Sequence, residues 1–108
     1  MTTFTTRGLE VEVSGQQGVG RLRLRGNFDF ASHRDFRAAS ERAMGLAADR
    51  VELDLEGVDY LDSAALGMLL VLEDDAKERR QKIAIVSCSE TARAVLEVAN
   101  LERLLGSR

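Results

Sequence analysis

The chain has 108 residues, of which 44% are apolar, 31% are charged and 5% are aromatic, and its formal net charge at pH 7 is −3. This length and composition predict one globular domain over residues 1–108, with a core of Leu, Val and Ala. The negative net charge argues against nucleic-acid binding, and no apolar run is long enough for a membrane span, so we expect no membrane insertion.

The single cysteine, Cys88, and the single histidine, His33, limit the chemistry that the chain can perform. One cysteine excludes an internal disulfide and fits a reducing compartment. The first residues, MTTFTTRG, lack the apolar core of a signal peptide, so we expect a cytoplasmic protein. We expect no metal site, because neither residue has further His or Cys ligands near it. With no P-loop, dinucleotide fingerprint or nucleophile–base pair, we expect no cofactor and no enzymatic activity.

The N-terminal third predicts a hairpin. We expect residues 1–8 to be a loose N-terminal arm. Apolar and polar residues alternate over 9–14 and again within 18–26, and the intervening Gly15-Gln16-Gln17-Gly18 is rich in turn residues. This alternation is typical of two half-buried strands that are joined by a tight turn.

Two helices and one strand are expected on either side of the central stretch 51–72. Ser32 and Asp35 have capping-box spacing at the start of a helix whose inner stripe is Phe36, Ala39 and Ala43 and which ends near Gly45. Residues 82–86 read as a short strand. Ser87 and Glu90 have capping-box spacing ahead of a last helix, and its apolar residues are Val95, Leu96 and Ala99.

The central stretch 51–72 reads as a buried strand, a short loop and an apolar helix. Val51, Leu53 and Leu55 alternate with acidic residues, Gly57 interrupts the run, and Ser63 stands where a helix N-cap is expected. From 64 to 72 every residue except Gly67 is apolar. A helix that is apolar all round must be covered on more than one side.

We assign two stripes to this helix. The stripe formed by Ala65, Leu69, Leu72 and Ala76 is expected to face the core of the chain. A second stripe consists of Ala64, Met68 and Val71. It either contacts another helix of this chain or is left for a partner.

A serine at a helix N-terminus has two interpretations, a structural cap or a phosphorylation site. A phosphate would add about −1.5 to −2 charges at neutral pH, and the positive end of the helix would tolerate it. A partner that packs an apolar or acidic surface on this junction would not tolerate it. That combination suits a reversible binding switch.

The run LDLEGVDYLDSAALGMLLVL resembles the signature of STAS domains, the family of anti-sigma-factor antagonists. Asp62, Ser63, Leu66 and Gly67 match the family pattern, whereas Ala64 and Ala65 stand where Ser or Thr and then Gly are usual. The resemblance implies that Ser63 is the phosphoacceptor, with Asp62 and Gly67 close to it.

The segment 26–30 also resembles the family, since Gly26, Phe28 and Asp29 keep its pattern and Asn27 departs from it. The resemblance implies that Asp29 lies near Ser63 and helps a kinase complex to form. The expected partner-binding residues are Phe28, Ala64, Met68 and Val71.

The order of elements is β-β-α-β-α-β-α. It predicts a single STAS-like domain with a mixed four-stranded sheet, or five strands as an alternative, and with helices mainly on one face. The resemblance implies a partner switch: the unphosphorylated protein binds an anti-sigma factor that is also a serine kinase, phosphorylation of Ser63 releases it, and a serine phosphatase restores binding. The alternative is a non-switching STAS subunit that docks constitutively on an ATPase, such as that of a lipid ABC transporter. We expect a monomer.

Overall fold

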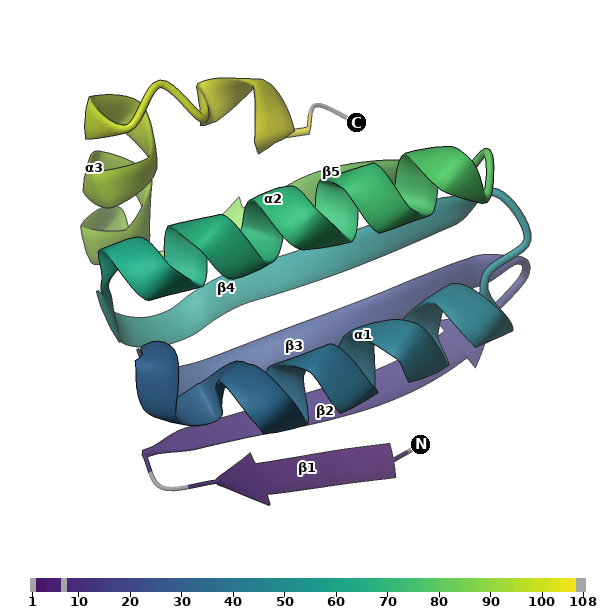
Figure 1. Ribbon diagram of the computed structural model, residues 1–108, viewed down its shortest axis with the longest axis horizontal. Helices are drawn as coiled ribbons and strands as arrows, with labels where there is room; N and C mark the ends of the chain where they lie inside the picture. Colours follow the sequence, from purple (N-terminus) through teal and green to yellow (C-terminus); the bar gives the residue numbers. More distant parts are fainter. Residues whose placement is uncertain (1, 7, 107–108) are drawn as a thin grey trace.

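A computed structural model describes residues 2–6 and 8–106, which form a five-stranded mixed sheet in the order β1-β2-β3-β4-β5 (Figure 1). The pairs β1/β2 and β2/β3 are antiparallel, and the pairs β3/β4 and β4/β5 are parallel. The strands are β1 (Thr2–Thr6), β2 (Leu9–Gln16), β3 (Val19–Phe28), β4 (Arg50–Leu61) and β5 (Lys82–Cys88).

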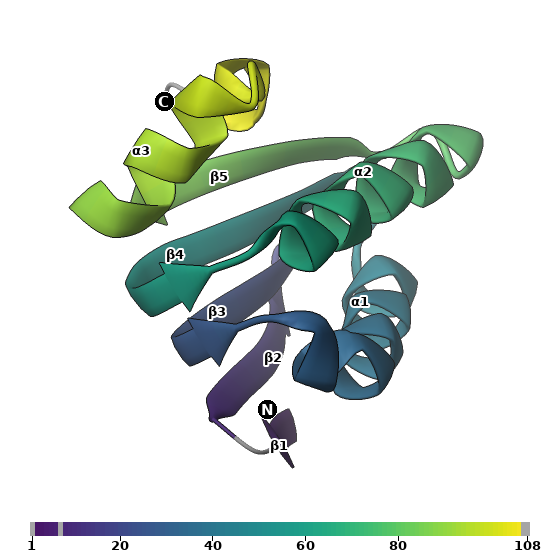
Figure 2. The ribbon, with the colours of Figure 1, turned by 60° about the vertical axis from the view of Figure 1, so that its left-hand side comes forward.

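Two helices connect the parallel strands. The crossover from β3 to β4 contains α1 (His33–Leu46), and the crossover from β4 to β5 contains α2 (Ser63–Glu78). Both crossovers step across the sheet in the same direction. Because such connections are almost always right-handed, both helices lie on the same face, as Figures 1 and 2 show. The expected α/β class, the mixed sheet and the placement of the helices are confirmed.

The loose N-terminal arm expected over residues 1–8 is wrong for the described part of it. Residues 2–6 form β1, which pairs with β2 in an unbroken register from Thr2↔Val13 to Thr6↔Leu9. Met1 and Arg7 lie outside the described residues. Thr and Phe favour extended backbone, but a five-residue segment without strict apolar–polar alternation gives little signal in the sequence.

The β2–β3 hairpin is confirmed, with a turn narrower than the expected four residues. Gln17 and Gly18 have φ angles of 55° and 82°. Positive φ at both central residues is the requirement of a type I′ turn, the two-residue loop that matches strand twist. Next to it, Gly20 lets α1 approach β3 closely, since a Cβ there would collide with the backbone oxygen of Ala43.

The core lies between the sheet and the two helices. The expected inner stripes are confirmed: Ala65, Leu69, Leu72 and Ala76 of α2 and Phe36, Ala39 and Ala43 of α1 are all buried. They pack on apolar side chains from β2, β3 and β4, which include Val11, Val13, Leu22, Leu24, Val51, Leu53 and Leu55. At about 25 cal/mol per Å² of buried apolar surface, this layer is the main source of stability.

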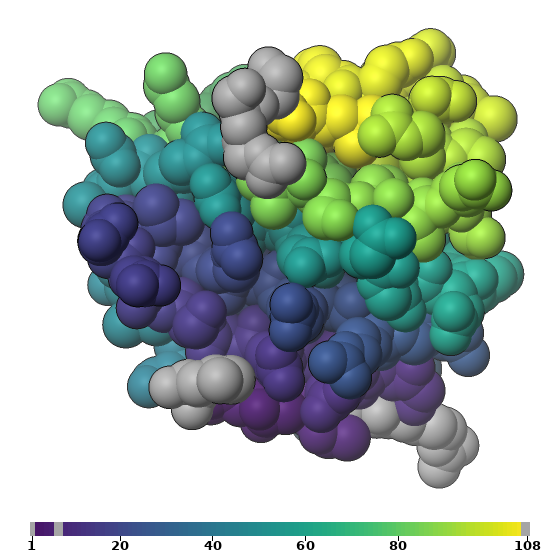
Figure 3. Space-filling view, turned by 180° about the vertical axis from the view of Figure 1, so that it is seen from behind, coloured from purple at the N-terminus to yellow at the C-terminus, as the bar shows by residue number. Residues whose placement is uncertain are grey.

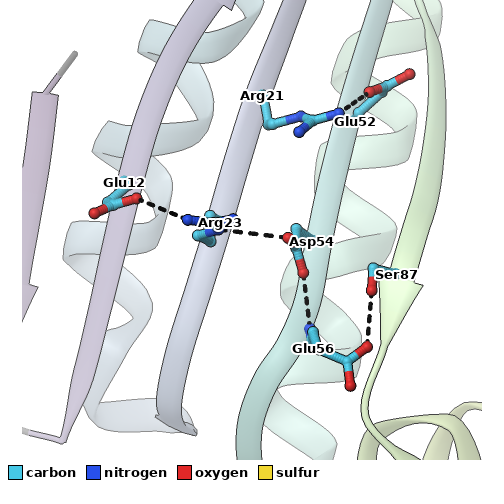
Figure 4. Close-up of polar contacts among 7 residues, drawn as sticks. All are labelled: Glu12, Arg21, Arg23, Glu52, Asp54, Glu56 and Ser87. Atoms are coloured by element: carbon cyan, nitrogen blue, oxygen red, sulfur yellow. Dashed lines mark hydrogen bonds and ion pairs between the residues drawn. The ribbon is translucent and has the colours of Figure 1, made fainter.

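Figure 3 views the molecule from the opposite side of the sheet. On that side β2, β3 and β4 carry charged side chains, which are at least partly exposed. Arg23 lies between Glu12 and Asp54, with nitrogen–oxygen distances of 3.8 and 3.4 Å (Figure 4). Arg50 and Arg21 both hydrogen-bond Glu52, at 2.8 and 2.9 Å, and these bonds hold the pKa of Glu52 below its ordinary value. The alternation of charged and apolar residues along β2, β3 and β4 therefore separates a solvated face from a buried one.

The C-terminal segment closes the β5 edge. Helix α3 (Glu90–Val98) packs against β4, and the short 3₁₀ helix η2 (Glu102–Leu104) leads the chain back beside β5. Leu105 forms a parallel bridge with Ile85, and the backbone N–H of Gly106 donates to the Ile85 oxygen at 2.9 Å. Arg103 pairs with the buried Glu73 of α2 at 2.9 Å, so this segment is tied to α2 as well.

Several expected helix ends are corrected. The cap of α2 is Asp62 instead of Ser63, and the cap of α3 is Ser89 instead of Ser87, which belongs to β5. A short 3₁₀ turn, η1 (Phe30–Ser32), precedes α1, so Ser32 makes no capping bond from its side chain. Gly45 lies inside α1, which ends one residue later at Leu46. The caps of α2 and α3 lie one and two residues from the expected serines, because neighbouring Asp and Ser side chains can cap the same exposed N–H groups.

Gly57 does not end the strand that precedes the site. β4 continues from Arg50 to Leu61, and the register with β3 shifts between Arg23 and Arg25, opposite Asp54 and Gly57. Such an irregularity bends the strand and re-aims the residues beyond it. The continuation delivers Leu61 and the loop at Asp62 to the edge of the sheet where β3 also ends.

Candidate functional site

The candidate site lies at the edge where β3 and β4 end. Phe28 and Leu61 are paired as the last residues of these parallel strands. The loops that follow them carry Asp29 and the Asp62-Ser63 pair. Because the carboxyl ends of parallel strands meet at one edge of a sheet, residues far apart in sequence come together there.

Asp62 joins the two loops. Its backbone N–H donates to the Phe28 oxygen at 3.3 Å. Its carboxylate accepts from the N–H of Ala65 at 2.9 Å, which caps α2, and from the N–H of Phe30 at 3.3 Å. Both sequence neighbours of Asp29 are therefore bonded to Asp62, and the structure brings the two expected segments together.

Asp29 itself acts locally in this structure. Its carboxylate accepts from the Ala31 N–H at 3.1 Å and caps η1. Among the described residues, neither Asp29 nor Asp62 forms an ion pair. The site thus holds two carboxylates without an ion-pair partner in the described part of the chain.

Ser63 is the first residue of α2, and its side chain is exposed. Positions four, seven and eight residues after it lie on the same side of a helix, and these are Gly67, Leu70 and Val71. All three are exposed, with Leu70 at 38% and Val71 at 49%. We call Ser63, Gly67, Leu70 and Val71 the outer face of α2; it is an apolar surface that begins at a free hydroxyl.

Gly67 leaves the middle of the outer face without a side chain. A Cβ at this position would meet no atom within 4 Å, so the fold does not require glycine there. Glycine inside a helix costs about 1 kcal/mol relative to alanine. The chain therefore carries a small loss of helix stability at the middle of its exposed apolar face.

Ala64, Met68 and Val71 line a groove between α1 and α2. This groove has a volume of about 340 Å³, and its other side is formed by α1 and the turn before it, including Phe30, His33, Phe36 and Met44. Ala64 and Met68 are half-buried, while Val71 is exposed. The sequence left open whether this stripe contacts another helix of the chain or stays available to a partner. In the structure it faces α1 and still reaches the surface.

Phe28 is corrected as a partner-binding residue. Its side chain is fully buried, and its ring lies 4.8 Å from that of Phe36, so it belongs to the core. Sequence reasoning missed Phe30, which is 69% exposed and stacks on His33, and Leu70 on the outer face. Helical spacing from Ser63 could have identified Leu70, whereas nothing in the sequence separates the roles of Phe28 and Phe30.

Other chemistry has little support in the described part of the chain. No group of three or more His, Cys, Asp or Glu residues could hold a metal ion there. Burial raises the pKa of the half-buried Cys88 thiol, which lowers its reactivity. No helix in residues 2–6 and 8–106 is long and apolar enough to cross a membrane.

Comparison with known proteins gives the family. The family description "Mlab, STAS domain" matches residues 11–106, which include both loops of the site. The chain belongs to the STAS domain family. A STAS-domain containing protein of Pseudomonas aeruginosa (strain UCBPP-PA14) is 42% identical over 83 residues, which are 77% of this chain and 81% of that protein.

Solved structures of anti-sigma factor antagonists share the fold. The antagonist SpoIIAA in its unphosphorylated form has a TM-score of 0.77 at 18% identity, over 91% of this chain and 87% of that one. An anti-sigma factor antagonist from Mycobacterium paratuberculosis has a TM-score of 0.77 at 16% identity, over 90% and 82%. SpoIIAA of Bacillus in its phosphorylated form has a TM-score of 0.70 at 18% identity, over 91% and 90%. These likenesses establish the fold of this STAS domain.

Proposed function

We propose that this STAS domain is an anti-sigma-factor antagonist that works as a partner switch controlled by phosphorylation of Ser63. The observation that carries the proposal is the outer face of α2, where an exposed hydroxyl begins an exposed apolar surface. The unphosphorylated face docks on an anti-sigma factor with serine-kinase activity. A serine phosphatase returns the modified protein to the binding state.

The local charges make a phosphate effective as a release signal. Asp29 and Asp62 already supply two carboxylates without ion-pair partners among the described residues. A phosphate on Ser63 adds about −1.5 to −2 charges. A partner that accepts the unmodified face then meets roughly twice the negative charge, and burying that charge in an apolar contact is costly.

The fold should tolerate the same phosphate. Ser63 is the first residue of a 16-residue helix, so its side chain lies at the positive end of the helix dipole. No core side chain has to move, because Ser63 is exposed. The switch therefore acts on the docking surface and leaves the domain folded.

The protein is proposed to be a substrate of the kinase and not an enzyme itself. Within residues 2–6 and 8–106, no histidine or lysine side chain is hydrogen-bonded to the Ser63 hydroxyl, and the nearby carboxylates of Asp29 and Asp62 accept from backbone N–H groups. The kinase partner supplies ATP and magnesium. We place the exchange in the cytoplasm of a bacterium; the relative at 42% identity is also a bacterial protein.

The test compares three variants for binding to the kinase, identified by co-purification from the native host. Ser63→Ala should bind and stay bound in ATP. Ser63→Asp should fold with an unchanged melting temperature and bind at least about tenfold more weakly, which is about 1.4 kcal/mol. Met68→Arg should weaken binding with little loss of stability, because Met68 is half-buried at the groove. Rapid release of Ser63→Ala in ATP would remove Ser63 as the acceptor.

A non-switching STAS subunit is the second candidate. The matching family description is that of Mlab and not of an antagonist, and Ala64 and Ala65 replace the hydroxyl residue and glycine of the usual motif. Such a subunit would dock on an ATPase through the same outer face. Co-purification separates the two functions: a soluble serine kinase supports the switch, and a membrane-bound ATPase supports the constitutive subunit.

A further inference from the structure

The two edge strands of the sheet, β5 and β1, differ in whether their outer backbone groups are paired. At the β5 edge, Leu105 and Gly106 pair with Ile85 and satisfy part of the outer backbone. At the other edge, no described residue pairs with the outer side of β1, and Figure 1 shows nothing beyond it. An edge strand presents a row of unpaired N–H and C=O groups, which is a ready template for another strand.

β1 has few of the features that normally protect an edge. Its five residues include no charged side chain and no proline, and its register with β2 contains no bulge. The inner strand β3, in contrast, carries Arg21, Arg23 and Arg25. Thr and Phe are strand-forming residues. Short length is the only protection that β1 retains.

The sequence of β1, Thr-Thr-Phe-Thr-Thr, reads the same in both directions. An antiparallel pair of two such strands, centred on Phe4, places Phe4 opposite Phe4 and Thr3 opposite Thr5. Aromatic pairs and threonine pairs both stabilise antiparallel strands. Phe4 is only partly buried against its own core, so the exposed part of each ring would be covered by the other.

We propose that β1 pairs with β1 of a second copy of this chain, which forms a two-fold symmetric dimer with a continuous ten-stranded sheet. A two-fold axis perpendicular to the sheet makes the contact self-complementary and leaves the helices of both copies on the same face. α2 contacts β4 and β5, away from β1. The two outer faces stay open, so the dimer would present two docking surfaces.

The pairing should be weak and dependent on concentration. A five-residue strand contact buries less than the roughly 1,600 Å² of a standard protein interface. The monomer expected from the sequence rested on the helix stripes and did not consider the sheet edge. The dimer does not depend on Ser63, so its failure would leave the proposed switch untouched.

The first test is sedimentation equilibrium of the full chain from low micromolar to millimolar concentration. Wild type should shift from monomer to dimer in this range. Thr3→Lys/Thr5→Lys places lysine opposite lysine, so its dissociation constant should rise at least about tenfold. Both positions are exposed and pair with Glu12 and Glu10 of β2, so the lysines should not weaken the fold.

The matched control, Ala94→Lys/Val98→Lys, adds the same charge at exposed positions of α3 and should dimerise like wild type. A second test uses the Cys88→Ser background: a mixture of Thr3→Cys and Thr5→Cys chains should form disulfides faster than either chain alone, because opposite residues lie within disulfide reach. The proposal is overturned if wild type stays monomeric throughout, if the lysine variant dimerises unchanged, or if the α3 control is the variant that breaks the dimer.

Discussion

Helices α1 and α2 occupy equivalent places in the fold and differ in their outer surfaces. Each follows a parallel strand, begins beyond an aspartate that caps a helical turn, and covers the same face of the sheet. The exposed side of α1 carries charged residues, namely Arg34, Arg37, Glu41 and Arg42. The outer face of α2 carries Ser63, Gly67, Leu70 and Val71.

The difference separates what the fold needs from what a partner needs. α1 shows that a helix in this position is stable with one apolar stripe and a charged exterior. The apolar residues on the outer face of α2 are therefore not required by the core, which the inner stripe already fills. They are available for contact with another protein, as the proposed switch requires.

The largest expected effect is on the inner stripe. Leu69→Ala removes a fully buried side chain and should lower the free energy of unfolding by about 2–5 kcal/mol. Leu70→Ala, at the next position, removes a side chain that is 38% exposed and should cost less than about 1 kcal/mol. Urea denaturation measures both. Equal losses would mean that the outer face is part of the core.

Replacing the cap of α2 should lower stability more than replacing the cap of η1. Asp62 accepts hydrogen bonds from two backbone N–H groups, whereas Asp29 accepts one from Ala31. Asp62→Ala should therefore lower stability by about 1–2 kcal/mol and more than Asp29→Ala does. Asp59→Ala, at an exposed aspartate of β4, is the control with no expected loss. A larger loss at Asp29 would contradict the assignment of Asp62 as the junction of the two loops.

A glycine in each helix allows the same substitution to be compared in α2 and α1. Gly67 of α2 and Gly45 of α1 are both exposed, and a Cβ at either position meets no atom within 4 Å. Alanine at each should raise the melting temperature and stabilise the fold by up to about 1 kcal/mol. Only Gly67→Ala should weaken partner binding, since it adds a methyl group to the docking surface. A destabilised Gly67→Ala would show a structural need for glycine instead.

The smallest effect is expected on the open face of the sheet, which is charged like the exterior of α1. Because Arg50 and Arg21 lower the pKa of Glu52, its carboxylate should stabilise the fold above the pKa of the unfolded chain and lose this contribution as pH falls through the folded value. Glu52→Gln should cost less than about 1 kcal/mol at neutral pH. Melting curves of both proteins should converge in acid, and a difference that grows in acid would contradict the ion pairs.

The sequence predicted the strands and the inner stripes because burial imposes a period that is visible in the residues. Leu22 and Leu24 alternate with arginines, and Leu69 and Leu72 recur at helical spacing. It missed β1 because its Thr-Thr-Phe-Thr-Thr has no alternation, and it shifted the cap of α2 by one residue because Asp62 and Ser63 can both cap a helix.

The location of the candidate site could be predicted from the sequence, but which apolar side chains around it are exposed could not. Asp62-Ser63 and Asp29 follow strands that end at one edge, and the pairing of β3 with β4 brings them together. Whether an apolar residue beside the site is buried depends on tertiary packing. Phe28 and Phe30 are two residues apart in the sequence, and only the turn of η1 between strand and helix places one in the core and the other in solvent.

Intact-mass spectrometry of the protein from its native host, with peptide mapping of residues 51–77, tests the central claim most directly. The account predicts a fraction of the protein with one phosphate, located on Ser63, and no phosphate on a Ser63→Ala variant from the same host. Absence of phosphate under several growth conditions, or a phosphate elsewhere in the chain, would contradict the switch and leave the outer face of α2 as a constitutive docking surface.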